Sequence, residues 1–226
     1  MILFVAPYHY PEEARGSLGA ARKIELILEQ LAGIDEDIVL INTNGTRNGG
    51  GLDLVEKRIG NVYIRELALP YLFNETITKI KSLFLASWLV NHILKSFGSP
   101  RFIWLYNGYA FESVFGRISK KKLGCPVILE FEDWHFARKR GFSPKPLLDW
   151  LAWRLLENHV DVSFAVNSTL ARRLGARYGA CHLLPGIVPR AIAFEATENI
   201  PFAGERKSIN IGYFGQLNTE KGVILS

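Results

Sequence analysis

The chain alternates between short apolar runs and longer segments with helical periodicity. The apolar runs are continuous rather than alternating in polarity, which is typical of strands buried on both faces of a parallel sheet. They occupy residues 2–6, 37–42, 102–107, 126–131 and 162–166. Helices are predicted over residues 17–31, 74–97, 109–122, 144–158 and 168–177. Because strands that alternate with helices imply right-handed crossovers, we expect an α/β fold with a Rossmann-like, doubly wound parallel sheet.

The first predicted helix is amphipathic. Its apolar face carries Leu18, Ala21, Ile24, Leu28 and Leu31. The charged residues expected to point away from that face are Arg22, Lys23, Glu25 and Glu29. Residues 54–67 predict an inserted hairpin that turns at Gly60 and Asn61. In the helix over 144–158, the residues expected to pack against the core are Leu147, Trp150, Leu151, Trp153 and Leu155.

The pattern changes near the carboxyl end of the chain. The 226 residues exceed one typical α/β domain and fall short of two. Residues 190–208 are irregular, and residues 209–226 begin a new strand, a Gly-rich turn and a helix. The sequence therefore predicts a complete Rossmann-like domain over 1–189, a linker over 190–208 and the truncated start of a second domain over 209–226.

Composition and charge narrow the class of protein. The hydrophobic share of 48% and charged share of 22% are those of a globular protein with a substantial core. A net charge of +5 favours an anionic ligand or a membrane surface over nucleic acid. The apolar amino terminus breaks at Pro7 without a basic leader, which indicates a strand rather than a signal peptide. Cys125 and Cys181 fit neither a disulfide framework nor a metal site, so we expect buried thiols in a cytoplasmic protein.

Three segments carry a family resemblance. PYHYPEEARGSLGAAR (7–22) follows the first strand, PVILEFEDWHF (126–136) ends a later strand in acidic residues, and FGQLNTEKG (214–222) forms a Gly-rich turn. In this order they resemble glycosyltransferase family 4, the retaining sugar-nucleotide transferases of the GT-B fold. That resemblance implies two Rossmann-like domains facing each other across a cleft, of which this chain holds the amino-terminal one and the start of the other.

The resemblance places donor-phosphate contacts on two loops. Gly215 and Lys221 match the family's phosphate-binding turn, Gln216 stands where Arg is usual, and Gly16 lies in the first strand-to-helix loop. A departing nucleoside diphosphate gains negative charge, which cations and a helix N-terminus stabilise. The resemblance thus implies a nucleotide-sugar substrate with no cofactor and no metal. An ordinary strand-to-helix turn remains the alternative at 214–222. A dinucleotide site is disfavoured, because no GxGxxG follows the first strand.

Acidic residues end the strand at 126–131. Glu130 and Asp133 match a variant found in family members that build surface polysaccharides, and Glu132 stands where other members have His. The carboxyl end of a central strand borders the ligand crevice of an α/β sheet. Glu130 and Asp133 are therefore the candidate catalytic residues, one of which would accept the proton of the acceptor hydroxyl or hold the acceptor's sugar ring. Glu132, Arg138 and Arg140 are acceptor-side candidates. The alternative for Asp133 is helix capping or an ion pair with either arginine.

A basic, aromatic segment, ARKRGFSPK (137–145), follows the predicted site. It suits a phospholipid-linked acceptor or peripheral contact with the inner face of a membrane. A solvated loop is the alternative, since runs of charge commonly have no other role.

Three functional hypotheses follow from these residues. The first is the acceptor-binding part of a glycosyltransferase that moves a sugar from a nucleotide-sugar to a glycan or lipid-linked acceptor in cell-surface polysaccharide biosynthesis. This chain by itself would then be inactive, so its status as an enzyme is open. The second is a stand-alone acceptor-binding or interaction module that pairs with a separate transferase half. The third is a truncated product without function.

Overall fold

The structure is a computed structural model that describes residues 1–10, 18–34, 37–46, 54–70, 75–133, 144–179 and 181–185. These residues belong to one compact unit, Met1–Ile187. The predicted linker over 190–208 and the predicted strand, turn and helix over 209–226 lie outside the described residues.

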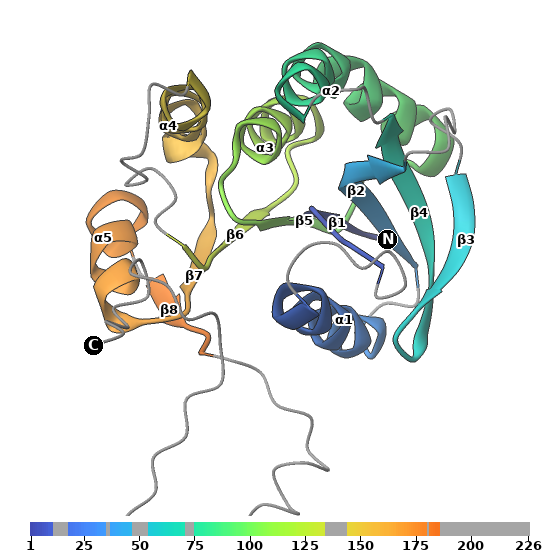
Figure 1. Ribbon diagram of the computed structural model, residues 1–226, viewed down its shortest axis with the longest axis horizontal. Coiled ribbons are helices and arrows are strands. Elements are labelled where there is room, and N and C mark those ends of the chain that lie inside the picture. The colour runs from blue at the N-terminus through green and yellow to red at the C-terminus, as the bar shows by residue number, and fades with distance from the viewer. Residues whose placement is uncertain are drawn as a thin grey trace, which may run out of the picture. The chain divides into compact units, whose positions relative to one another are not determined.

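The described residues form an eight-stranded sheet with the strand order β3-β4-β2-β1-β5-β6-β7-β8 (Figure 1). The strands are β1 Ile2–Ala6, β2 Ile38–Thr46, β3 Leu54–Ile59, β4 Val62–Pro70, β5 Phe102–Tyr106, β6 Val127–Phe131, β7 Val162–Ala165 and β8 Cys181–Leu183. Neighbouring strands are parallel except β3, which pairs antiparallel with β4. The predicted Rossmann-like α/β sheet is confirmed.

Helices cover both faces of this sheet (Figure 1). They are α1 Leu18–Ala32, α2 Glu75–Phe97, α3 Ala110–Leu123, α4 Pro144–Leu156 and α5 Ser168–Tyr178, and a short 3-10 turn, Glu157–His159, follows α4. Helix α1 packs on one face, whereas α2, α3 and α4 lie side by side on the other (Figure 1). Each face therefore has its own apolar core. Among the described helices, none combines the length and the apolar character needed to cross a bilayer.

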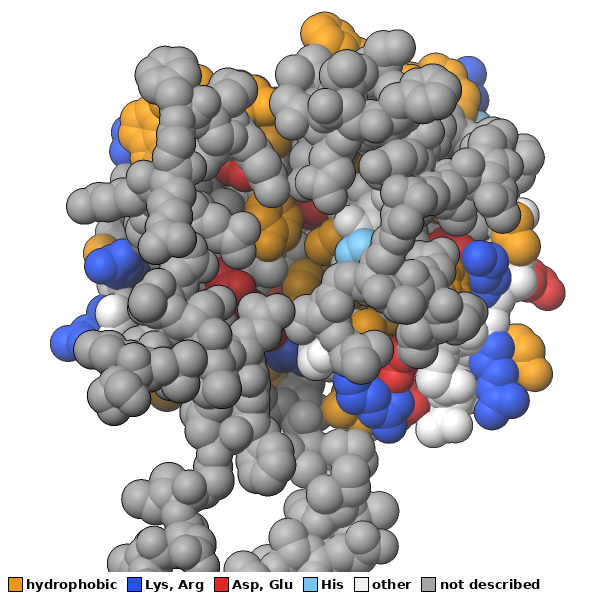
Figure 2. All heavy atoms as spheres, in the orientation of Figure 1, with side chains coloured by type: hydrophobic (Ala, Val, Ile, Leu, Met, Phe, Trp, Pro, Cys, Tyr) orange, Lys and Arg blue, Asp and Glu red, His pale blue; other side chains and the backbone are white. Residues whose placement is uncertain are grey.

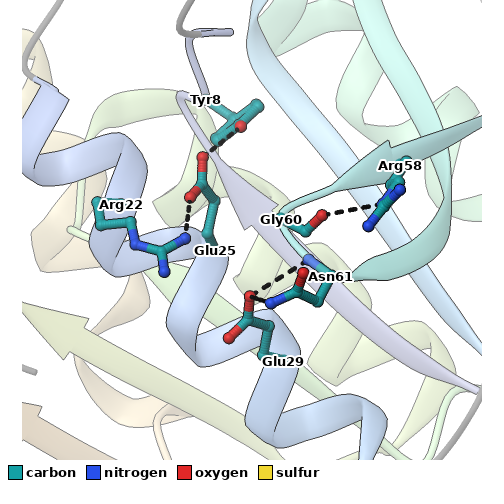
Figure 3. A network of polar contacts seen from close by, with 7 residues as sticks. All are labelled: Tyr8, Arg22, Glu25, Glu29, Arg58, Gly60 and Asn61. Carbon is teal, nitrogen blue, oxygen red and sulfur yellow. Dashed lines mark hydrogen bonds and ion pairs between the residues drawn. The ribbon is translucent and has the colours of Figure 1, made fainter. Parts of the chain in front are cut away.

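The predicted hairpin is confirmed, with its turn at Gly60 and Asn61. Gly60 has the left-handed φ of 58°, and a Cβ there would lie 2.8 Å from Glu29 Oε1. The same oxygen accepts hydrogen bonds from the backbone and side-chain nitrogens of Asn61 at 3.2 and 3.1 Å (Figure 3). The second arm of the hairpin, β4, also pairs in parallel with β2, so the hairpin belongs to the main sheet.

The prediction that the charged side chains of α1 point away into solvent is wrong at two positions. Lys23 and Glu25 are each only 7% exposed. Glu25 accepts a hydrogen bond from the Tyr8 hydroxyl at 3.0 Å and pairs with Arg22 at 2.7 Å (Figure 3). The segment after β1 and the hairpin turn therefore cover parts of α1 that the helical period assigns to solvent.

The prediction that five apolar residues of α4 pack in the core holds only for Trp153, which is 1% exposed. The other four are exposed: Leu147, Trp150, Leu151 and Leu155. Cys125 is buried as expected, and burial raises the pKa of its thiol. Cys181 is not fully buried, because it lies on β8 at the edge of the sheet.

Helix α3 takes its amino-terminal cap from α4. Tyr109, the residue before α3, makes no side-chain capping bond. Instead, the buried Asp149 accepts a hydrogen bond from the backbone N–H of Ala110 at 2.9 Å. The first turn of one helix is thus completed by the neighbouring helix.

We expect Asp149→Ala to lower the free energy of unfolding by about 1–3 kcal/mol, because it leaves the buried N–H of Ala110 without its acceptor. Asp149→Asn retains an acceptor oxygen and should lose less. Urea denaturation followed by circular dichroism measures both variants. Equal losses in the two variants would contradict the capping role.

Candidate active site

The carboxyl ends of β1, β5 and β6 are neighbours at the point where the strand order reverses direction. From β1 the chain moves outward to β2, whereas from β5 it moves the other way to β6 and β7. The crevice beyond the carboxyl ends of the strands at such a switch point is where open α/β sheets bind ligands. Tyr8 follows β1, Asn107 follows β5, and Glu132 and Asp133 follow β6. The predicted acidic segment is therefore at the position that the topology favours.

Glu130 and Glu132 turn toward the face of the sheet that α1 covers. The two residues are separated by one position, so their side chains share a face. From α1, the Lys23 ammonium reaches Glu130 Oε1 at 2.5 Å and Glu132 Oε1 at 2.7 Å. Trp104 Nε1 donates to Glu130 Oε2 at 3.0 Å, and the Tyr106 hydroxyl donates to Glu132 Oε2. One buried cation therefore joins both carboxylates to α1.

The two carboxylates differ in access to solvent. The Glu130 side chain has no exposed surface, whereas that of Glu132 is 22% exposed. Asp133, the next residue, is exposed. Glu130 is thus enclosed, and of the three acids at the end of β6 only Glu132 and Asp133 have surface exposed to solvent.

Burial and charge pairing have opposite effects on the pKa values of Lys23 and Glu130. Burial disfavours the charge on Lys23, but attraction to Glu130 and Glu132 and hydrogen bonds with them outweigh it and raise the pKa of Lys23. Burial raises the pKa of Glu130, and the ammonium of Lys23 only partly offsets that rise. Burial, together with the negative charge of Glu132, also raises the pKa of Tyr106. Lys23 is consequently a cation and Tyr106 a hydroxyl donor at neutral pH.

Asn107 fixes the backbone at the end of β6. Its φ of 60° is the one positive value among the non-glycine residues that the structure describes. Its N–H donates to the carbonyl of Glu130 at 2.7 Å, and its Oδ1 accepts from the N–H of Glu132 at 2.8 Å. Asparagine tolerates this left-handed conformation better than most residues. The direction in which Glu132 leaves the sheet is therefore set from β5.

A second polar cluster anchors the segment after β1. Asn42 Oδ1 accepts from the N–H of Tyr8 at 3.1 Å, and its Nδ2 donates to Glu66 Oε1 at 2.8 Å. Glu66 Oε2 accepts from the Tyr10 hydroxyl at 2.7 Å and pairs with Lys57 at 3.1 Å. The start of the loop that leads into α1 is thus held against β2 and β4.

The structure brings together some of the predicted site residues. Glu130, Glu132 and Asp133 gather at the end of β6. The others lie outside the described residues: Gly16, Arg138, Arg140, Gly215, Gln216 and Lys221. Sequence reasoning missed the site residues Lys23, Glu66, Tyr106 and Asn107. A signal was available for Asn107, which is a polar residue directly after an apolar strand.

Solved structures share the fold of this chain. No protein-family model matches the chain, and no curated protein matches it. An E. coli structure described as trehalose-6-phosphate bound with UDP-2-fluoro glucose matches over 89% of this chain and 52% of its own, with a TM-score of 0.50 and 14% identity. A UDP-forming α,α-trehalose-phosphate synthase from Burkholderia xenovorans matches over 87% and 50%, with a TM-score of 0.52 and 13% identity.

The chain shares their fold. These neighbours are glycosyltransferases of the GT-B class, and this chain spans about half of their length. At this level of identity the match confirms the Rossmann-like fold expected from the sequence.

Two substitutions at Asn107 separate backbone strain from hydrogen bonding. Asn107→Gly loses the acceptor for the Glu132 N–H but adopts a positive φ freely, whereas Asn107→Ala loses the acceptor and is strained. We expect the Ala variant to be less stable than the Gly variant by about 1 kcal/mol. Thermal and urea unfolding of the pair test this, and an Ala variant as stable as the Gly variant would refute it.

Lys23→Met should lower the free energy of unfolding at neutral pH by about 3–5 kcal/mol, because it leaves the Glu130 carboxylate buried without its cation. Adding Glu130→Gln should recover part of this loss, because the second change removes the unpaired charge. Urea unfolding of the single and double variants gives the comparison. No recovery in the double variant would contradict the ion pair as the cause.

The loss of stability caused by Lys23→Met should depend on pH through the ionisation of Glu130. Below its ordinary pKa of 4.5 the carboxyl group is neutral in the folded and unfolded chain, so the Met variant should approach the wild type there. The stability deficit of the Met variant should grow as the pH rises through the raised pKa of Glu130 in the folded state. A deficit that is constant between acid and neutral pH would show that lost packing, not charge, is responsible.

Proposed function

We propose that the chain is the acceptor-side domain of a family 4 glycosyltransferase. The enzyme would transfer a sugar from a nucleotide-sugar to a glycan or lipid-linked acceptor in the synthesis of a cell-surface polysaccharide. The observation that carries this proposal is the pair Glu132 and Asp133, which reaches the surface at the switch point while Lys23 and Tyr106 hold Glu132 from behind. The fold shared with trehalose-phosphate synthases supports the wider GT-B class.

The geometry suggests a division of roles among the three acids. Sugar hydroxyls are donors that an ionised carboxylate binds well. Glu132 is held in place by Lys23 and Tyr106, which suits it to orient an acceptor ring. The exposed Asp133 is the candidate to accept the proton from the attacking hydroxyl. Glu130, fully enclosed, would act as a positioning residue by holding Lys23.

The donor side of the proposal rests on the sequence. Gly16, Gly215, Gln216 and Lys221 would contact the donor diphosphate, and the proposal includes no resident metal or cofactor. Arg138 and Arg140 would contact the acceptor. A cytoplasmic location with peripheral attachment at the inner face of the membrane is part of the same proposal, because a lipid-linked acceptor is reached there.

Because the domain is proposed to bind the acceptor, we expect the 226-residue chain to bind saccharides by itself. We expect a glycan array, supplemented with polyprenyl-phosphate-linked sugars, to show binding that Glu132→Gln weakens about tenfold, the loss expected when a charged hydrogen-bond acceptor is removed. Asp133→Asn should weaken binding less, because Asp133 is assigned a role in proton transfer. Saturation-transfer NMR on one retained saccharide would confirm the site.

The matched control is Glu56→Gln on the edge strand β3, which removes an exposed carboxylate away from the crevice and should leave binding unchanged. Equal binding by the wild type and Glu132→Gln would refute the assigned role of Glu132. Absence of binding to every saccharide tested would refute the acceptor-domain proposal.

A further inference from the structure

Strand β3 forms one edge of the sheet. In the part of the chain that the structure describes, it is the last strand on that side, next to β4 (Figure 1). Of its six residues only Ile59 is buried, so most of the strand is open to solvent. Figure 2 shows charged side chains of both signs beside hydrophobic ones at that edge. A strand at the edge of a sheet presents backbone N–H and C=O groups with which another strand can pair.

The turn of the hairpin determines which backbone groups of β3 face outward. Ile59 and Val62 flank its two-residue turn, and the residues that flank such a turn form a hydrogen-bonded pair. Bonded and non-bonded pairs alternate along an antiparallel ladder, so Arg58 and Glu56 belong to non-bonded pairs with β4. The backbone N–H and C=O groups of Glu56 and Arg58 therefore point away from β4, toward the edge of the sheet.

A second copy of the same strand fits this edge in one register. In a two-fold antiparallel pair, residues at equal distances on either side of the axis lie opposite each other. With the axis at Lys57, Glu56 of each copy lies opposite Arg58 of the other, and the outward backbone groups of these residues meet. With the axis at Glu56, two glutamates would lie opposite each other, which is unfavourable. Charge therefore selects the register about Lys57.

The two copies of Lys57 would be the like-charged contact at this axis. However, the Lys57 ammonium turns back over its own copy, where Nζ lies 3.1 Å from Glu66 Oε2 and 4.3 Å from the centre of the Tyr10 ring. Glu66 is on β4, on the inner side of β3. Each ammonium is thus paired with a carboxylate of its own copy. A lysine on an edge strand commonly discourages pairing, but this one is directed inward.

We propose that two copies of this chain associate through β3, antiparallel about Lys57, to form one continuous sheet. The pairs of Glu56 with Arg58 specify the register, and the backbone bonds of the same residues join the strands. On the other face of the sheet, Val55, which is 47% exposed, would lie opposite Ile59 of the second copy. This inference does not depend on the proposed transferase activity, because β4 and β2 separate β3 from the strands that end at the crevice.

The test is sedimentation equilibrium of the 226-residue chain over a range of concentrations. We expect a concentration-dependent equilibrium between monomer and dimer, because a six-residue strand provides a small interface. Glu56→Arg and Arg58→Glu should each raise the dissociation constant of the dimer at least about tenfold, because each places like charges opposite each other on both sides of the axis. Combining the two changes should restore the dimer, because the exchanged charges are again complementary. Circular dichroism checks the fold of each variant.

Amide hydrogen exchange locates the contact in the unmodified chain. Raising the protein concentration should slow exchange at Glu56 and Arg58, whose N–H groups face outward. Exchange at Lys57 should not change, because its N–H already bonds to β4. This measurement decides the proposal even where a charge variant fails to fold.

The matched control is Lys121→Glu on α3, an exposed position where the substitution changes the net charge by the same amount as Arg58→Glu. This control should associate as the wild type does. A wild type that stays monomeric at every concentration, or a dimer that Arg58→Glu leaves intact, would overturn the proposal. Loss of the dimer in both single variants without recovery in the double variant would overturn the register about Lys57.

Discussion

The ammonium of Lys23 is the interaction on which the candidate site depends. It lies between the carboxylates of Glu130 on β6 and Glu132 directly after β6, more than a hundred positions later in the chain, and it joins α1 to the end of that strand. A buried carboxylate such as Glu130 is tolerated only when a cation and hydrogen-bond donors compensate for lost hydration. Lys23 and Trp104 provide that compensation, and the exposed part of Glu132 is oriented as a result. The orientation of Glu132 therefore depends on packing between α1 and the end of β6.

The sheet was predictable from the sequence because strands that are buried on both faces form uninterrupted apolar runs. The predicted strands at 2–6 and 102–107 match β1 and β5 to within a residue, since each is an uninterrupted apolar run. The predicted helices also agree closely with α2, α3 and α5. The place of β4 beside β2 was missed, because a hairpin pattern indicates the partner within the hairpin and carries no information on the other edge of the strand.

The site was less predictable, for a physical reason. A lysine in an amphipathic helix has the same local pattern whether it meets water or a buried carboxylate. The difference for Lys23 lies in Glu130 and Glu132, which are distant in sequence. The reverse error occurred on α4, where five tryptophans and leucines were expected to pack in the core but only Trp153 of the five is enclosed. Periodicity identifies a face of a helix, but it does not identify what covers that face.

The cap that Asp149 places on α3 has a consequence for how the domain assembles. The acceptor for the first N–H of α3 is 39 positions away, on a helix that follows another strand. Until α4 has docked, α3 lacks its cap and its first turn frays. Helix α3 can therefore form early in folding but becomes complete only when β6 and α4 are in place. The two helices are thereby joined into one cooperative unit, which should open and close together in native-state hydrogen exchange.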